Sequence, residues 1–255
     1  MTERATAGPE VSSPGWRSET DMPARDRWSA RAAVLALSSF TIAAVLLGVV
    51  HLDPELGGID SVTAMLSDYG LVRGWWLWDL SLVATSVGSL AVLVAMRRQA
   101  ILARGAAMSC MGLWCGCVLL VAAFTKDPQG GAVTLTGKIH LYATALSCAS
   151  LPIAGLALGR QHHARPGWQS FARWARWLAA ASIPLFLPFI LPFAGTVLLG
   201  SRALPSLPTG LIERLMAVLD LAVLVTFALW SWHATRNPAV PARSAPDQTA
   251  SAAAA

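Results

Sequence analysis

The sequence predicts an all-α protein, a polytopic transmembrane bundle of six helices. The chain has 255 residues, of which 55% are hydrophobic and only 13% are charged. A soluble domain carries charge on about a quarter of its residues, so this chain has about half the usual share. Its charges are clustered and leave apolar runs of about 20 residues, the length that a helix needs to cross about 30 Å of hydrocarbon. Spans of a membrane β-barrel would be shorter and would alternate in polarity.

Six apolar runs are long enough to span a bilayer. They cover residues 32–51, 75–96, 106–124, 139–159, 178–200 and 211–232. Together they define a transmembrane domain over residues 30–233. Residues 1–29 and 234–255 are rich in Ala, Ser, Pro and charge without apolar periodicity, which predicts two disordered cytoplasmic tails. The first tail is too long and too polar for a simple cleavable leader, so the first span is expected to remain as an anchor.

The basic residues predict an orientation, because Lys and Arg are enriched in loops that stay in the cytoplasm. With both termini inside, fourteen of the nineteen Lys and Arg residues are cytoplasmic. The other five are Arg73, Lys126, Lys138, Arg202 and Arg214. This imbalance predicts a multi-pass inner-membrane protein with both termini in the cytoplasm and with the lipid bilayer as its main partner. Because the basic residues lie in short loops beside the spans, they indicate topology and not a nucleic-acid surface.

The tryptophans favour the same arrangement, since their rings prefer the headgroup level of a membrane. Trp168 and Trp230 are among those expected to mark inner ends of spans. The longest connection, residues 52–74, contains a short amphipathic pattern that predicts a helix of one or two turns in the first outer loop. Asp60 is placed to cap its start and Gly70 to end it.

Ionisable residues of the spans gather toward the outer side. Asp79 lies about one turn into the second span and Asp220 lies near the bilayer midplane. An ionised carboxylate facing lipid there would cost about 2.5 kcal/mol or more, so both are expected to face the bundle interior. Glu213 and Asp220 are seven residues apart and share one face of the sixth helix. His140, Thr144 and Ser147 form a similar stripe on the fourth helix, and two facing stripes predict a cavity that opens outward.

Several of these polar residues are candidates for chemistry. His140 lies near the start of its helix, where the helix dipole disfavours imidazolium, and a neutral histidine can bind a metal or accept a proton. The candidate catalytic residues are His140, Asp127 and Asp68, and the candidate metal ligands are His140, His51 and Asp127. The candidate binding residues are Asp68, Asp79, Asp127, His140, Glu213, Arg214 and Asp220. Asp68 is expected to pair with Arg73, Lys138 or Arg214.

Four short motifs follow one another along the chain: LSDYG at 66–70, FTKDP at 124–128, GKIH at 137–140 and GLIER at 210–214. In this order, and at these places relative to the spans, they resemble the bacterial and archaeal membrane family catalogued as domain of unknown function 998. The resemblance covers about residues 30–233. It implies a six-helix membrane protein without an established activity, with Asp68, Asp127, His140 and Arg214 at the positions of the family's polar motifs.

Three functions remain open at this point. The polar cluster can bind a ligand, a lipid headgroup or a membrane-protein partner, or it can belong to a hydrolase-like enzyme acting on a lipid or a small extracytoplasmic substrate. The hydrolase resembles, in placement only, the alkaline ceramidase and adiponectin-receptor superfamily, which uses three histidines where this chain offers His51 and His140. A proton-coupled carrier using Asp220 would lack the internal repeat and broken helices of carriers. Polar residues also serve as hydrogen-bonding contacts between helices. The pattern specifies no cofactor and leaves open whether the chain is an enzyme.

Overall fold

Within residues 24–199 and 208–237, which the computed structural model describes, the chain forms six long helices and one short 3-10 helix. The long helices are α1 (Ala24–Leu52), α2 (Trp75–Arg98), α3 (Ala106–Ala123), α4 (Leu135–His162), α5 (Gln169–Leu199) and α6 (Thr209–Arg236). The 3-10 helix, η2 (Leu66–Leu71), lies in the connection between α1 and α2. No strand occurs in these ranges, and the all-α prediction is confirmed.

Each long helix coincides with one predicted apolar run, and α1, α4 and α5 begin between one and three turns before it. Hydropathy marks only the apolar part of a helix, whereas capping decides where the helix begins. α4 begins four residues before its predicted span because the Thr134 side chain accepts a hydrogen bond from the Gly137 backbone N–H at 3.1 Å. The predicted tails, 1–29 and 234–255, lie mostly outside the described residues. Within the described ranges, residues 24–29 and 234–236 belong to α1 and α6 and are helical.

Five of the described helices are long and apolar enough to cross a membrane. They are α1, α2, α3, α4 and α6. α5 is 31 residues long but is not among the five. The protein therefore has the features of a multi-pass membrane protein, and the count of six spans stays a prediction.

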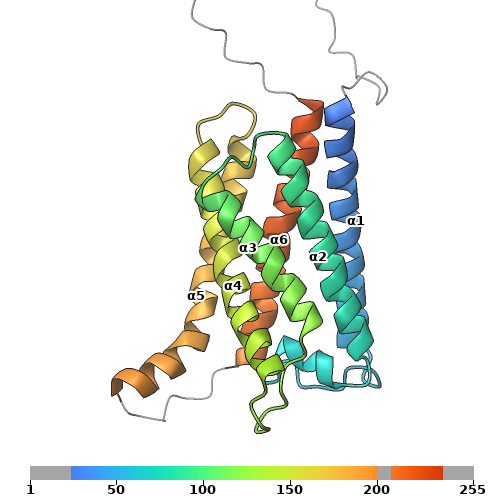
Figure 1. The fold of residues 1–255 in the computed structure, drawn as a ribbon, viewed down its shortest axis with the longest axis vertical. Coiled ribbons are helices and arrows are strands. Elements are labelled where there is room, and N and C mark those ends of the chain that lie inside the picture. Colours follow the sequence, from blue (N-terminus) through green and yellow to red (C-terminus); the bar gives the residue numbers. More distant parts are fainter. Residues whose placement is uncertain (1–23, 200–207, 238–255) are drawn as a thin grey trace, which may run out of the picture.

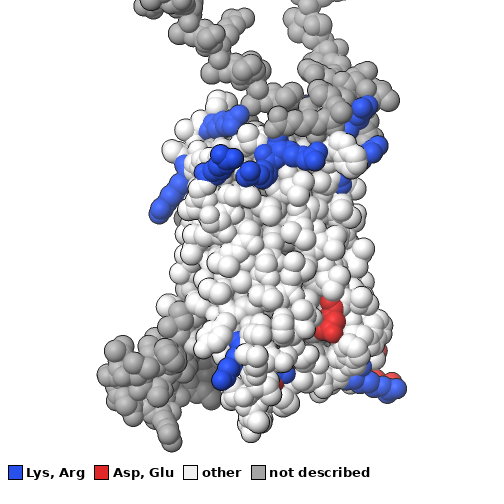
Figure 2. Space-filling model, in the orientation of Figure 1, with Lys and Arg blue, Asp and Glu red and all other residues white. Residues whose placement is uncertain are grey.

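The helices run alternately up and down the bundle (Figure 1). Each packs against the next in sequence, and α6 also packs against α1, α2 and α4. α1 begins and α6 ends at the same end of the bundle, which we call the terminal end. The opposite end carries η2 and the α3–α4 connection, and we call it the loop end. One face of the surface shows Lys and Arg side chains in a band at the terminal end, above a broad zone without charge (Figure 2).

The core near the terminal end contains an aromatic cluster. Trp168 and Trp230, which were expected to mark inner ends of spans, are both buried within the bundle. Their rings pack edge to face on each other and on His162, whose Nε2 is 2.8 Å from the Ile101 carbonyl oxygen. These tryptophans join α4, the start of α5 and α6, because large aromatic rings fill the space where three helices meet.

The loop between α1 and α2 also differs from its prediction. The only helix described in it begins at Leu66, and Asp60 lies outside that helix. Asp60 instead accepts hydrogen bonds from the Thr63 hydroxyl at 2.6 Å and the Val62 N–H at 3.0 Å, which form a local turn. The carbonyl groups of residues 62 and 64, next to this turn, accept hydrogen bonds from α6, which hold this part of the loop against that helix.

Candidate functional site

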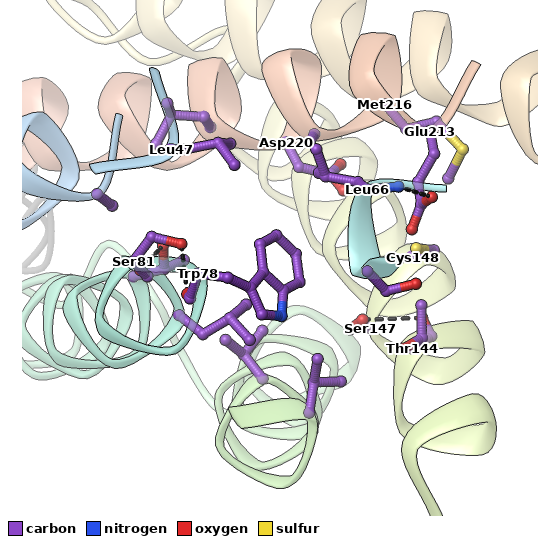
Figure 3. Close-up of a pocket in the computed structure, with 18 of the residues that line it drawn as sticks. Leu47, Leu66, Trp78, Ser81, Thr144, Ser147, Cys148, Glu213, Met216 and Asp220 are labelled. Atoms are coloured by element: carbon purple, nitrogen blue, oxygen red, sulfur yellow. Dashed lines mark hydrogen bonds between the residues drawn. The ribbon is translucent and has the colours of Figure 1, made fainter. Parts of the chain in front are cut away.

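A cavity of about 170 Å³ lies inside the loop-end half of the bundle, between α1, α2, α3, α4, α6 and η2 (Figure 3). Its walls are mainly apolar, and Trp78 and Trp114 provide aromatic surface. The ionisable and hydroxyl side chains that line it are Ser67, Ser81, Thr85, His140, Thr144, Ser147, Cys148, Glu213 and Asp220. The cavity therefore combines an apolar enclosure with a few polar groups, which is typical of small-molecule sites.

Helical spacing places the polar residues on the cavity side. On α6, Glu213, Met216, Ala217 and Asp220 recur every three or four residues and share one face. On α4, residues 140, 144, 147 and 148 follow the same rule. Figure 3 shows Glu213 and Asp220 projecting from α6, with Thr144, Ser147 and Cys148 of α4 across from them. The two stripes expected from the sequence line the same cavity.

His140 lines this cavity and carries a buried hydrogen-bond acceptor without a partner. Its Nδ1 lies 2.7 Å from the Phe124 carbonyl oxygen, which is free to accept because α3 ends at Ala123. A carbonyl cannot donate, so Nδ1 carries the proton and Nε2 of the neutral ring has a free lone pair. The side chain is only 6% exposed, and Nε2 has no hydrogen-bond partner in the structure. Burial without a partner is unfavourable, so this atom needs an explanation.

The two carboxyl groups of α6 differ in their partners. Asp220 is 6% exposed and makes no hydrogen bond within the described residues. Glu213, one turn before Met216, accepts the backbone N–H of Leu66 through Oε2 at 2.6 Å. Because Leu66 opens η2, this bond ties the loop to α6 across 147 residues of sequence. The remaining oxygen of Glu213 and the whole of Asp220 are left to the cavity.

A second polar group surrounds the cavity at the loop end and fastens η2 to the bundle. We call it the η2 latch, and its members are Asp68, Tyr69, Lys126, Glu213 and Arg214. Asp68 forms an ion pair with Lys126 at 2.6 Å, with the two side chains 14% and 11% exposed. The other oxygen of Asp68 accepts the Met65 N–H at 2.7 Å. Asp68 was expected to pair with Arg73, Lys138 or Arg214, and that expectation is wrong.

Arg214 completes the latch from α6. Its guanidinium donates to the Ala64 carbonyl oxygen at 2.8 Å and to the Tyr69 hydroxyl at 3.3 Å. The Tyr69 hydroxyl is also 2.7 Å from Nδ1 of His51. Gly210 allows this close approach, since a Cβ at that position would overlap the Ala64 carbonyl group. The loop backbone is joined to α6 directly as well, by the Leu211 N–H and the Val62 carbonyl oxygen at 3.1 Å.

Asp127 organises the start of α4. It accepts hydrogen bonds from the Thr134 hydroxyl at 2.7 Å and from the Thr134 N–H at 2.8 Å. These bonds, the hydroxyl one first, hold the pKa of the Asp127 carboxyl below its ordinary value of 3.8. Gly137 packs against the same carboxylate, where any larger residue would overlap it. The hydroxyl of Thr63, followed by the Val62 N–H, likewise lowers the pKa of Asp60.

The structure thus separates the predicted site residues into groups. His140, Glu213 and Asp220 line the cavity, whereas Asp68 and Arg214 belong to the latch. Asp127 caps a loop, and His51 contacts Tyr69. Asp79 is half-exposed and does not line the cavity, contrary to expectation. The cavity face of α2 is set by Trp78, Ser81 and Thr85, and one residue along a helix turns the side chain about 100° away.

The three candidate metal ligands do not converge. His140 contacts Phe124, His51 contacts Tyr69 and Asp127 contacts Thr134. Within residues 24–199 and 208–237, no three His, Cys, Asp or Glu side chains are grouped closely enough to hold a metal ion. The four cysteines in this part of the chain are free thiols.

Sequence reasoning missed two functional partners. Lys126 was treated only as a basic loop residue, although its place beside Asp127 in FTKDP is a signal that the motif carries both charges. Thr134 was not singled out, although a Thr directly before an apolar helical run is a common helix cap. In both cases the partner lies across a connection, at separations of 58 and 7 residues.

The fold and the site define an all-helical bundle with several helices apolar enough to cross a membrane and an internal cavity at one end. Residues 55–230 match the model of the family described as "Protein of unknown function (DUF998)", and the chain belongs to that family. The four motifs that carry the sequence resemblance all lie in the matched range, and the structure brings them together in the latch, the cavity wall and the start of α4. No curated protein and no solved structure matches the chain.

Proposed function

We propose that the chain is a six-span protein of the bacterial cytoplasmic membrane with both termini in the cytoplasm, so that the loop end faces outward. The fourteen Lys and Arg residues assigned to the cytoplasmic side fall in the tails and the connections of the terminal end, and five fall in the rest. Figure 2 supports the proposal, since the basic band and the uncharged zone follow each other along the bundle axis. Such a bias orients helical membrane proteins.

We further propose that the protein binds a small amphipathic ligand in the cavity. The observation that carries this proposal is a carboxyl group without a partner on the cavity wall: Asp220 lines the cavity, is 6% exposed and makes no hydrogen bond in the described chain. His140 lines the same cavity, and its buried Nε2 also has no partner. Polar residues that act only as contacts between helices should be bonded to neighbouring helices. Asp220 makes no such bond, so a purely structural role does not account for it.

The dimensions of the cavity indicate the size of the ligand. Its volume of about 170 Å³ is far more than the about 10–15 Å³ needed by one water. It is also smaller than the about 300–1,000 Å³ of sites for drug-sized ligands. A compact molecule with a short apolar body and one polar group fits these walls.

The latch provides a reason for the enclosure. Leu66 and Ser67 of η2 form part of the cavity wall, and Glu213 both binds η2 and lines the cavity. Opening the latch would expose the cavity to the loop end. We propose that the ligand reaches the site by this route.

Filling the cavity tests the proposal. Ala217 lines the cavity on α6, and its neighbour Val218 is exposed on the outer face of the same helix. We expect n-hexylammonium, n-hexanol or hexanoate to raise the melting temperature of the wild type and of Val218→Phe. We expect no ligand-dependent rise in Ala217→Phe, because the added ring occupies the site. Differential scanning fluorimetry of the purified proteins measures this.

A second variant that fills the cavity, Ala43→Leu on α1, provides the same test if Ala217→Phe does not fold. Size-exclusion chromatography of each variant shows whether it is folded. The proposal is abandoned if none of the three probes stabilises the wild type, or if folded filling variants respond as the wild type does.

One observation favours the hydrolase alternative. The Thr144 hydroxyl, one helical turn from His140, is also buried without a partner, so two residues of the cavity wall offer a base and a hydroxyl group on one helix. Hydrolysis of 4-nitrophenyl butyrate by the wild type, lost in His140→Gln, would favour an enzyme. Equal background rates for both proteins would leave binding as the function.

A further inference from the structure

Building on the proposed binding function, we infer that the polar group of the ligand is a primary ammonium. The cavity is lined by two acids, Glu213 and Asp220, and by no Lys or Arg among the described residues. The charge that complements such a lining is positive. An anion could be bound only with both carboxyl groups protonated, whereas a cation pairs with either group in its ionised form.

The hydrogen-bonding groups of the lining point to the same conclusion. Ser81, Thr85 and Ser147 already donate to carbonyl oxygens of their own helices, at 2.7, 2.8 and 2.8 Å. The Asp220 carboxyl makes no hydrogen bond in the described chain, and Glu213 uses only one oxygen, for the Leu66 N–H. Among the buried lining atoms, Nε2 of His140 and the Thr144 hydroxyl have no partner. A ligand rich in N–H donors satisfies them, and a primary ammonium carries three.

The remainder of the cavity selects an organic cation over an inorganic one. The wall is mainly apolar, with Leu47, Trp78, Trp114 and Leu221 among its members. Metal cations such as Ca²⁺ take six to eight oxygen ligands, and no three metal-binding side chains converge in the described chain. An ammonium group with a short apolar body uses both the acids and the apolar wall.

Burial explains why Asp220 would discriminate among ligands. An ionised carboxylate without a partner is strongly disfavoured in an apolar interior. A bound ammonium removes this penalty by pairing with the charge, whereas an alcohol of the same length does not. Figure 3 shows Asp220 on the cavity side of α6, on the same side as Glu213.

The test compares six-carbon probes that differ only in the polar group. We expect n-hexylammonium to bind the protein in phosphatidylcholine nanodiscs at least tenfold more tightly than n-hexanol, with hexanoate weaker still. Hexyltrimethylammonium, which has the charge but no N–H donor, should bind at least tenfold more weakly than n-hexylammonium. Isothermal titration calorimetry measures all four dissociation constants.

Two Asp→Asn substitutions, one inside the cavity and one outside it, distinguish binding at the proposed site from nonspecific binding. Asp220→Asn should bring the affinities for n-hexylammonium and n-hexanol to within about threefold of each other. Asp79→Asn, on α2 outside the cavity, should leave their ratio unchanged. Retained binding of n-hexanol by Asp220→Asn shows that the variant is folded. If it does not fold, His140→Leu is measured for the same loss of preference.

The outcomes distinguish this inference from the proposed function. Suppose that n-hexanol or hexanoate binds as tightly as n-hexylammonium and that Ala217→Phe abolishes this binding. The inference that the ligand is an ammonium is then wrong, whereas the proposal that the cavity binds a ligand is supported. If Ala217→Phe changes the binding of no probe, the inference and the proposed function are both wrong. If the ratio of affinities for n-hexylammonium and n-hexanol is unchanged in Asp220→Asn, the inference of an ammonium ligand is also wrong.

Two sources can provide a primary ammonium: a free amine or the headgroup of an aminophospholipid. Nanodiscs of phosphatidylethanolamine distinguish them. Weaker apparent binding of n-hexylammonium there than in phosphatidylcholine indicates that the headgroup competes for the site. Equal affinity in the two lipids indicates a free amine.

Discussion

At the scale of single residues, Glu213 belongs to two groups at once. One of its oxygens accepts the Leu66 N–H and holds η2, and the side chain also lines the cavity. Any molecule that competes for Glu213 therefore acts on the latch as well. This dual position links the state of the cavity to the position of the loop through one side chain.

The ion pair between Asp68 and Lys126 gives a first prediction. Removing one partner of a fully buried pair costs about 3–5 kcal/mol, and this partly buried pair should cost less. We expect Lys126→Met to lower the free energy of unfolding by about 1–3 kcal/mol. Denaturant unfolding in detergent measures it. Lys138→Met, at an exposed position of α4, should change it by no more than about 0.5 kcal/mol.

A double variant shows whether the lost charge pair is the cause. Asp68→Asn combined with Lys126→Met leaves no unpaired charge, so it should be more stable than Lys126→Met alone. If the double variant is the less stable of the two, the ion pair is not what holds Asp68.

The second prediction concerns pH. Because the folded pKa of Asp127 lies below its ordinary value of 3.8, its stabilising bonds are fully present above pH 3.8. They are lost as the pH falls through the lowered folded pKa. The amide signal of Thr134 in an NMR titration should therefore change with a midpoint below 3.8. A peptide of residues 124–138 should titrate at the ordinary value, and equal midpoints in peptide and protein would contradict the hydrogen bonds.

The sequence predicted which residues share a face of a helix better than it predicted which residues bind each other across the fold. The spacing of Glu213 and Asp220, and of His140, Thr144 and Ser147, follows from helix geometry alone, and all five line the cavity. The partner of Asp68 could not be derived in this way, because Lys126 lies 58 residues away in another connection. Which loops meet at the end of a bundle depends on tertiary packing, and local pattern does not contain it.

At the scale of elements, η2 shows how tertiary bonds override local propensity. The apolar pattern from residue 59 onward suits a longer helix, but Asp60 forms a turn with residues 62 and 63, and α6 binds the carbonyl groups of residues 62 and 64. The described helix begins only at Leu66, in the part of the loop that covers the cavity. The predicted bounds of the long helices were much closer, because an apolar run depends mainly on local composition.

The third prediction tests the contact between the loop and α6. We expect Gly210→Ala to lower the free energy of unfolding by about 1–3 kcal/mol, since its Cβ would overlap the Ala64 carbonyl group. Hydrogen exchange at the backbone amides of η2 should become faster as well. Gly112→Ala on α3 is the matched control, because its Cβ would meet nothing within 4 Å. It should be neutral or stabilising by up to about 1 kcal/mol.

Hydrogen exchange separates this effect from general destabilisation. Faster exchange confined to the loop supports a local contact. Equal changes in η2 and in the aromatic cluster at the terminal end would show that Gly210 has no special role in holding the loop.

At the scale of the whole molecule, alternate helices return the chain to the same end, so α1 begins where α6 ends (Figure 1). All connections rich in Arg then lie together. The sequence predicted this arrangement from charge and hydropathy. The volume of the cavity could not be predicted, because the space between helices depends on how their side chains pack together.

The fourth prediction tests the proposed orientation. In a background with the four native cysteines changed to Ala, Val133→Cys at the loop end should react with a membrane-impermeant maleimide on intact cells. Arg104→Cys, in the connection between α2 and α3, should react only after the cells are permeabilised. Both positions are exposed, so access and not burial decides the labelling. The reverse pattern would place the terminal end outside.

The contact between η2 and α6 also sets an order for assembly in the cell. The loop is made after the first helix, but Glu213 and Arg214 are made only with the last one, 147 and 150 residues beyond the backbone groups that they bind. During synthesis, five helices have been translated before the loop meets its partners. The chamber therefore cannot be complete until α6 has been made, because α6 supplies part of its wall and the bonds that hold the loop.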